Sequence, residues 1–204
     1  MTVANLDTKA EQMPESEKNP RANIFILSGP SGVGKRTVRE RLDMEDLNME
    51  NSVSWTTRAP RAEDEEGVTY HFATPEEFEA AVARDEFAEH AGFADHAYGT
   101  PRSQIEGRIA KGINVMLEIE VNGAEQVMEK YPEAVSIFLV PPTLEELESR
   151  LKNRGTESED AVNARLARAR VEMDMRTKYQ HVVVNDDAQR AADEVAAIIK
   201  ECAE

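Results

Sequence analysis

Residues 24 to 42, IFILSGPSGVGKRTVRERL, constrain the fold more than any other stretch of the chain. The apolar run from Ile24 to Leu27 predicts a buried strand, and Val38 and Leu42, one helical turn apart, predict a helix after it. Between them, three glycines let successive backbone N–H groups converge on one anion at the positive end of the new helix. Strand, glycine turn and helix together predict a phosphate-binding loop.

The polar residues of this loop indicate a nucleoside triphosphate site. Lys35 supplies a mobile charge for the β- and γ-phosphates, but Arg36 stands where the motif places a hydroxyl for magnesium, and Thr37 follows it. Because arginine does not ligate a metal, we expect magnesium to be held mainly by water and nucleotide oxygens. A glycine turn that merely ends a strand is the alternative, and seven matching positions in the right context argue against it.

Composition excludes several classes of protein. The 204 residues suit one sizeable domain with small insertions. A net charge of −16, from 40 acidic and 24 basic residues, argues against unaided binding to nucleic acid or to an anionic membrane. No apolar run spans a bilayer and the first twenty residues do not form a signal peptide, so a cytoplasmic protein is expected. The single Cys202 excludes an intrachain disulfide, and no Cys/His cluster predicts a metal site.

Apolar segments alternate with amphipathic ones along the rest of the chain. Three further apolar runs predict buried strands: residues 113–119, 135–140 and 181–184. Thr74-Pro75-Glu76-Glu77 is a capping box that predicts the start of a helix. This alternation predicts an α/β fold with a mostly parallel sheet and helices on both faces. Ligands bind at the carboxyl ends of such strands, where the glycine loop, Glu118 and Asn185 are expected to gather.

Two stretches concentrate arginine in an otherwise acidic chain. Arg58 and Arg61 flank Ala59-Pro60, and because proline biases its predecessor away from helix, we expect an extended turn whose two guanidinium groups could clamp a phosphate. Taken alone, such a pair is better explained as a soluble surface. The densest basic region is 150–176, on a predicted pair of charged helices.

Several separated motifs, in order, resemble the guanylate kinases from about Asn23 to the C-terminus. They are GPSGVGK, SVSWTTRAPR with EGVTYHF, EFAEH, YGTP, LEIEVNGA, FLVPP, RLKNRGTE with NARL, and VVVNDD. Guanylate kinases are nucleoside monophosphate kinases of the P-loop NTPase superfamily. The resemblance implies that ATP transfers its γ-phosphoryl group to GMP, giving ADP and GDP, with Mg²⁺, in purine nucleotide metabolism. It implies the small-molecule partners ATP and GMP, no nucleic acid or membrane partner, and a monomer or homodimer.

The resemblance also implies a division of the chain. The parts are a disordered tail (1–22), a core segment with the phosphate loop (23–53), a small mixed α/β GMP-binding insert (54–100), a second core segment (101–153), a helical lid (154–178) and a last core segment (179–204).

Roles for single residues follow from the same resemblance. The residues implied for GMP are Ser54, Arg58, Arg61, Tyr70, Glu89, Tyr98, Thr100 and Glu120. Those implied for ATP are Gly29, Pro30, Ser31, Gly32, Val33, Gly34, Lys35, Arg36, Thr37 and Asn185. The implied catalytic set is Lys35, Arg58, Arg154 and Arg165, the last two from the lid. Glu118 and Glu120 match acidic positions near magnesium and GMP, with their separate roles open.

Chemistry supports the assignment of Glu89 to the base. Guanine presents N1–H and its 2-amino group as adjacent donors that one carboxylate accepts, whereas adenine presents an acceptor at N1. A site built on such pairing discriminates strongly, because the wrong base leaves a buried group unmatched.

Three positions depart from the family pattern: Arg36, where serine, threonine or glycine is usual, Glu120, where aspartate is frequent, and Trp55, where a smaller residue is common. Two other functions fit parts of the pattern. A kinase for a sugar phosphate would give Ser54, Glu89 and Thr100 no base edge to bind. A non-catalytic module that binds peptides typically lacks an intact phosphate loop, which this chain keeps.

Overall fold

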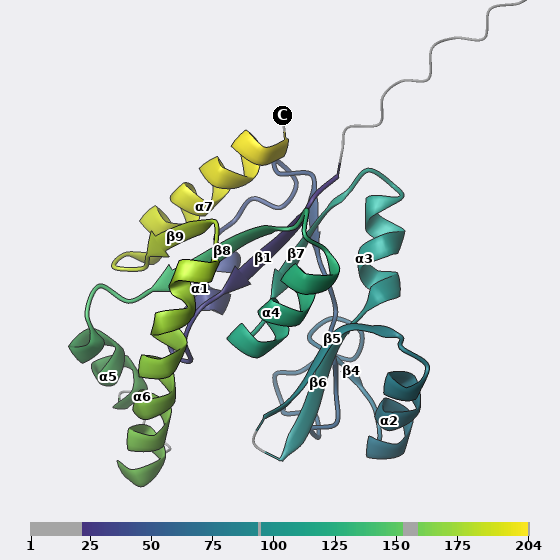
Figure 1. Cartoon of the computed structure of the whole chain (residues 1–204), viewed down its shortest axis with the longest axis horizontal. Helices are drawn as coiled ribbons and strands as arrows, with labels where there is room; N and C mark the ends of the chain where they lie inside the picture. The colour runs from purple at the N-terminus through teal and green to yellow at the C-terminus, as the bar shows by residue number, and fades with distance from the viewer. Residues whose placement is uncertain (1–21, 94, 153–158, 204) are drawn as a thin grey trace, which may run out of the picture.

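The computed structural model describes residues 22–93, 95–152 and 159–203 (Figure 1). Its centre is a five-stranded sheet of order β2-β7-β1-β8-β9, the core sheet. The strands are β1 (Ile24–Ser28), β2 (Met49–Asn51), β7 (Asn114–Glu118), β8 (Val135–Val140) and β9 (His181–Val184). All four pairings are parallel, so every strand ends at the same edge of the sheet. The parallel α/β fold expected from the sequence is confirmed.

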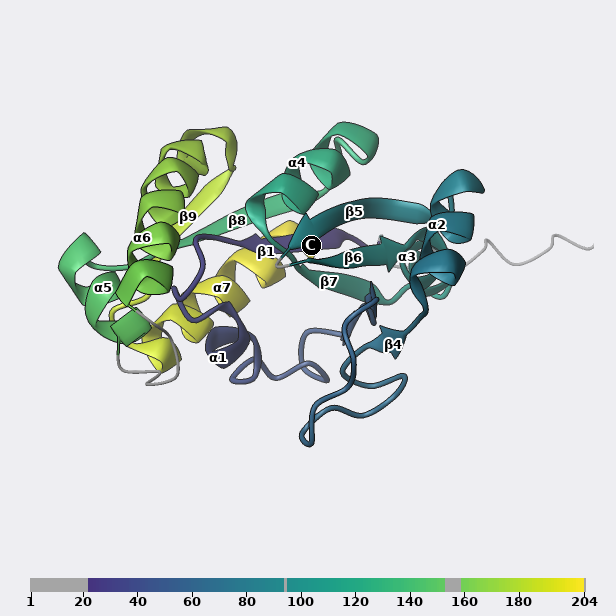
Figure 2. The same cartoon turned by 90° about the horizontal axis from the view of Figure 1, so that it is seen from below.

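Helices cover both faces of the core sheet. They are α1 (Lys35–Arg39), α3 (Arg102–Ile109), α4 (Val121–Lys130) and α7 (Ala188–Ala203). The helices α5 (Leu144–Lys152) and α6 (Glu159–Asp174), followed by the 3-10 helix η1 (Met175–Lys178), pack on each other at the end of the sheet (Figure 1). Figure 2 shows α4 on one face of the sheet and α1 with α7 on the other.

The alternation of side chains along β1 builds two cores. Phe25 and Leu27 are fully buried on the side of α1 and α7, where they share a cluster with Val195. Ile24 and Ile26 point the other way into the cluster formed with α3 and α4. Since successive side chains of a strand alternate between faces, an all-apolar strand needs cover on both sides. The apolar run therefore fixes β1 in the middle of the sandwich.

A second, four-stranded sheet of order β4-β3-β6-β5, the small sheet, stands beside the core sheet (Figure 1). Its elements are β3 (Trp55–Thr56), β4 (His71–Phe72), α2 (Pro75–Ala83), β5 (Phe87–Phe93) and β6 (His96–Pro101). The capping box is confirmed, since the Thr74 hydroxyl accepts from the Glu77 amide (3.2 Å) and the Glu77 carboxylate accepts from the Thr74 amide (2.8 Å). Phe78 of α2 stacks on Phe87 of β5 with centroids 4.7 Å apart, which fixes α2 on this sheet.

The stretch after the glycine loop differs from the expectation. The helix ends at Arg39, and Arg41 and Leu42 donate to carbonyls three residues back, so the chain tightens into turns. Leu42 is nevertheless buried, as its spacing indicated. The segment 39–50, expected to be a solvated helix face and exit, contains the short edge strand β2. Of the three residues of β2 only Met49 is buried, and one buried residue is too few to form a pattern that predicts a strand.

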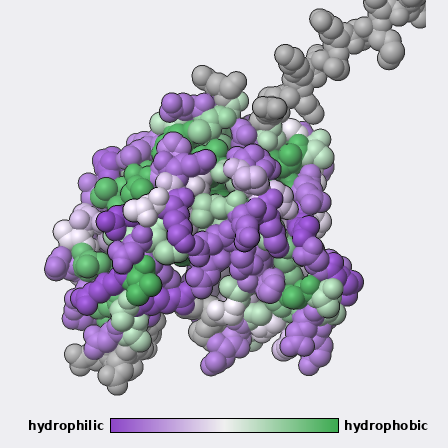
Figure 3. Space-filling view, in the orientation of Figure 1, coloured by the Kyte–Doolittle hydropathy of each residue, from purple (hydrophilic) through white to green (hydrophobic). Residues whose placement is uncertain are grey.

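The exterior in this view is largely hydrophilic, and hydrophilic side chains gather over α4 at its centre (Figure 3). Within the described ranges, no helix is both long and apolar enough to cross a bilayer. The tail expected at 1–22 lies, up to residue 21, outside these ranges, and the division of the chain into core, insert and lid stays a prediction.

Phe138 and Val182 provide a matched test of the core. They are register partners on β8 and β9, but Phe138 is fully buried 4.7 Å from the Tyr179 ring whereas Val182 is 45% exposed. Phe138→Ala should lower the free energy of unfolding by about 3–5 kcal/mol, because it leaves a cavity. Val182→Ala should cost less than about 1 kcal/mol. Denaturant titration measures both, and equal losses would contradict this placement.

Candidate functional site

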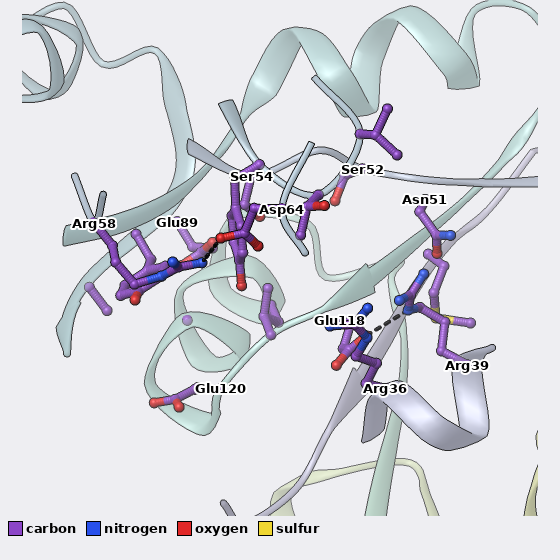
Figure 4. A pocket seen from close by; sticks show the side chains of 18 of the residues that line it. Arg36, Arg39, Asn51, Ser52, Ser54, Arg58, Asp64, Glu89, Glu118 and Glu120 are labelled. Carbon is purple, nitrogen blue, oxygen red and sulfur yellow. Dashed lines mark hydrogen bonds and ion pairs between the residues drawn. The ribbon is translucent and has the colours of Figure 1, made fainter. Parts of the chain in front are cut away.

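A cavity of about 580 Å³ joins the small sheet to the carboxyl edge of the core sheet (Figure 4). From the small sheet and its loops it is lined by residues that include Ser54, Arg58, Arg61, Tyr70, Glu89 and Tyr98. From the core side it is lined by residues that include Arg36, Arg39, Glu118 and Glu120. Two groups of side chains that are far apart in sequence therefore face one space.

Glu89 forms the polar floor of this cavity. Its side chain, on β5, is only 5% exposed, and its Oε1 accepts a hydrogen bond from the Thr100 hydroxyl (2.7 Å). Ser54 lies 3.2 Å from the same hydroxyl oxygen and donates to it, because the Thr100 proton is already given to Glu89. Burial raises the pKa of Glu89 to about 7, against the opposing effect of the Thr100 bond. The result is a carboxylate with unused acceptor capacity in a confined space.

Arg58 is held ready for an anion by acidic and aromatic neighbours. Its guanidinium contacts the Asp64 carboxylate (2.8 Å) and lies 5.5 Å from the centroid of the Tyr70 ring. Asp64 also accepts from the backbone amide of Arg61 (2.7 Å), at the start of the turn that follows Arg61. Both arginines lie outside any helix, as expected, and Asp64 contacts the side chain of Arg58 and the backbone of Arg61.

The glycine loop, residues 29–35, runs from the end of β1 into α1. Lys35 Nζ donates to the carbonyl oxygens of Gly29 (2.7 Å) and Pro30 (3.4 Å), which folds the lysine back over its own loop. Burial lowers the pKa of Lys35, while Glu120, Glu118 and Glu172 act to raise it.

Asn185, which follows β9, supports the loop from behind. Its side-chain amide donates to the Val33 carbonyl (2.7 Å), and the Arg150 guanidinium donates to the Asn185 carbonyl (2.9 Å). Asn185 is only 4% exposed, and its buried side chain holds the glycine loop in place through the bond to Val33.

Helix α6 also contacts the loop. The Glu172 carboxylate accepts from the Ser31 backbone amide (3.2 Å), and Arg165 donates to the Ser31 hydroxyl (2.9 Å). Arg168 spans two carboxylates, donating to Glu172 (2.7 Å) and to Glu120 (2.6 Å). The Glu172 carboxylate thereby accepts a hydrogen bond from a backbone amide of the loop, as an anionic ligand would.

The two other arginines near the loop are paired with glutamates. Arg39 of α1 contacts Glu118 at the end of β7 (2.6 Å), as the dashed line in Figure 4 shows. Arg36, at the position of the usual hydroxyl, contacts Glu40 one turn along α1 (2.7 Å) with a side chain that is 64% exposed. This exposed i,i+4 pair contributes little to stability.

The residues expected to bind one ligand do come together. Seven of the eight implied for GMP line the cavity, and the eighth, Thr100, lies directly behind Glu89. The residues implied for ATP form the glycine loop and its support at Asn185, and Arg36 of this group also lines the cavity. Arg165 touches the loop through Ser31. Arg154 lies outside the described residues. Ligand contacts of all these residues stay predictions.

Among the residues of the site that were not singled out from the sequence, five make contacts that shape it. They are Arg39, Asp64, Gly123, Arg168 and Glu172. Asp64 lies in a run of acids and Arg168 in a run of arginines, so no pattern separated either from its neighbours. Gly123 lies in the motif LEIEVNGA. A glycine inside a helix is the one signal that could have pointed to a side chain packed closely against the helix backbone.

Residues 21–202 match the family described as "Guanylate kinase". A curated guanylate kinase of Oceanobacillus iheyensis is 49% identical, over 87% of this chain and 86% of that protein. One of Halalkalibacterium halodurans is 46% identical over 86% of each chain. A crystal structure of guanylate kinase from Anaplasma phagocytophilum superposes with a TM-score of 0.71 at 33% identity and covers 89% of this chain and 86% of that one.

The raised pKa of Glu89 predicts a pH dependence of stability. Between its ordinary value of 4.5 and about 7, the folded protein keeps a proton that the unfolded chain releases, so stability falls as the pH rises through this window. Glu89→Gln cannot titrate and should lack this loss. Relative to the wild type, its unfolding free energy should gain on the order of 3 kcal/mol between pH 4.5 and pH 8. Denaturant titrations at both pH values test this, and a constant difference would refute the buried, ionisable state.

Proposed function

This chain belongs to the guanylate kinase family, and on that premise we propose how its residues transfer the γ-phosphoryl group of ATP to GMP. The observation that carries the assignment is the single cavity in which a buried carboxylate, Glu89, and a fixed guanidinium group, Arg58, lie together beside the glycine loop. The end of the cavity with Glu89 suits a guanine base. The end with Arg58 suits the phosphate of GMP, which has to lie next to the γ-phosphate of ATP.

Glu89 reads the base in this proposal. Its carboxylate accepts the N1–H and 2-amino donors of guanine. Thr100 holds one carboxylate oxygen, Ser54 bonds the Thr100 hydroxyl, and both lie near the carbonyl of the base. Adenine places an acceptor at N1 against the same carboxylate and leaves it unmatched. The burial of Glu89 makes that mismatch costly, since no water replaces the missing donor.

Arg58 and Arg61 hold the GMP phosphate, with Tyr70 and Tyr98 on the same wall of the cavity. Asp64 and the Tyr70 ring already restrict Arg58, so less side-chain entropy is lost when a phosphate binds. The guanidinium fork suits the bidentate contact that phosphate oxygens offer.

The glycine loop and Lys35 hold the ATP phosphates, and Arg165 and Arg154 act on the transferring group. Ser31 places Arg165 against the loop, which supports that role. ATP competes with the Glu172 carboxylate for the Ser31 amide, so its binding loosens the contact between α6 and the loop. Phosphoryl transfer depends mainly on alignment and charge stabilisation, and these cations supply both without a strong base.

Magnesium is expected with ATP, and the residues near the loop fit it. Glu118 and Glu120 bring carboxylate oxygens, the ligands that Mg²⁺ prefers, to the wall of the cavity. Among the described residues no group of three or more His, Cys, Asp or Glu could hold a metal ion. Nucleotide and water oxygens would therefore supply most of the coordination. Bound there, the ion neutralises phosphate charge.

ADP formation across a panel of nucleoside monophosphates tests the proposed reading of guanine. With ATP and Mg²⁺ we expect turnover of GMP, far slower turnover of AMP, and none of ribose 5-phosphate, because the last has no base for Glu89. Comparable rates for AMP and GMP would contradict the role of Glu89. Preference for the sugar phosphate would contradict the whole assignment.

Arg58→Ala tests the phosphate clamp. Loss of a charged hydrogen-bond donor should remove about 2 to 3 kcal/mol of transition-state stabilisation, seen as a lower kcat/KM for GMP with the KM for ATP unchanged. Arg84→Ala is the matched control, since Arg84 forms an exposed pair with Glu86 and lies outside the cavity lining. Steady-state kinetics measures both variants, and wild-type turnover in Arg58→Ala would reject its role.

A further inference from the structure

We propose that Gly123 is a specificity-determining position, because its missing side chain leaves the space in which the Glu89 carboxylate aligns with guanine. This inference rests on the proposed role of Glu89 in reading the base. Gly123 itself touches no reacting atom and acts as a positioning residue.

The space at Gly123 is filled by Glu89. A methyl group on Gly123 would lie 2.6 Å from Glu89 Oε2, closer than such atoms approach one another, and 3.1 Å from Cδ, which is a tight contact. The opposite oxygen, Oε1, is fixed by the Thr100 hydroxyl at 2.7 Å. The carboxylate thus lies between a hydroxyl on one side and the bare backbone of α4 on the other. A methyl group on Gly123 pushes Oε2 aside, and because Oε1 is bonded to Thr100, the shift distorts that bond as well.

Helix α4 cannot retreat instead, because it is tied to β5 on both sides of Glu89. The Gln126 side chain accepts from the His90 amide (3.2 Å) and donates to the His90 carbonyl (2.9 Å), so it pairs with β5 as a neighbouring strand would. Lys130 Nζ donates to the Phe87 carbonyl (3.2 Å). These three bonds fix the distance between helix and strand, and an added methyl group must displace the carboxylate.

Displacement of the carboxylate should weaken recognition of the base and leave the binding of phosphate and ATP unchanged. Guanine needs two donors satisfied by one carboxylate, so a shift or tilt breaks at least one bond. IMP keeps N1–H but lacks the 2-amino group, and it therefore has less to lose. The contacts of Arg58 with phosphate and of the glycine loop with ATP do not involve Gly123.

The experiment compares Gly123→Ala with Gly107→Ala at pH 8, where Glu89 is ionised. Gly107 lies in α3 with nothing within 4 Å of an added methyl group, so it controls for the effect of alanine on a helix. We expect Gly123→Ala to lower kcat/KM for GMP on the order of 10²-fold, as misplacement by about an ångström does. Its GMP-to-IMP ratio should fall, its KM for ATP should stay unchanged, and Gly107→Ala should match the wild type in all three.

A second measurement keeps the inference testable if Gly123→Ala folds poorly. Alanine favours a helix, so both glycine replacements should raise the Tm unless a clash opposes them. Adding Gly123→Ala to a Glu89→Ala protein removes the clash, and the Tm should then rise as it does for Gly107→Ala. In the presence of Glu89, Gly123→Ala should instead lower the Tm.

The outcomes separate this inference from the function on which it rests. If wild-type enzyme prefers GMP to IMP and Gly123→Ala keeps both that ratio and the GMP kinetics, Gly123 does not position Glu89. A loss of Tm in Gly123→Ala that persists in the Glu89→Ala background also overturns the inference. If the Glu89→Ala variant itself keeps the wild-type ratio, the assigned role of Glu89 fails first.

Discussion

Several arginines of this site are paired with carboxylates of the same chain, and the arrangement of the active edge depends on that pairing. Arg58 is held by Asp64, and Arg168 is held between Glu120 and Glu172. In the proposed function, nucleotide binding exchanges one anion for another, which costs less than removing water from an isolated charge.

The same pairing explains how a chain of charge −16 handles two polyanions. Its net charge opposes long-range attraction of nucleotides, so binding depends on local clusters with fixed geometry. The Ser31 amide shows the principle at the level of the backbone, because a carboxylate from α6 accepts its hydrogen bond. This contact links helix α6 to the glycine loop, and in the proposed function ATP competes for it.

Sequence reasoning found the parts of this protein whose signals are local. The glycine loop, the apolar strands and the capping box at Thr74 each need only neighbouring residues, since turn geometry, strand burial and helix capping act over a few positions. It overestimated the helix after Lys35 and missed β2, because Met49 has too few buried neighbours in sequence to form a pattern. The resemblance to a family supplied the pairing of Arg58 with Glu89 that no local signal contains.

The sequence by itself predicted which chemistry the chain carries: a phosphate loop, a pair of arginines and, through the family resemblance, an acidic group suited to guanine. Only the tertiary structure decided how those groups are held. Asp64 fixes Arg58, Gly123 leaves room for Glu89, and Gln126 fixes the distance between α4 and β5. Two of these three act across dozens of residues of chain, where periodicity and spacing carry no information. Packing and side-chain hydrogen bonds alone bring them within reach.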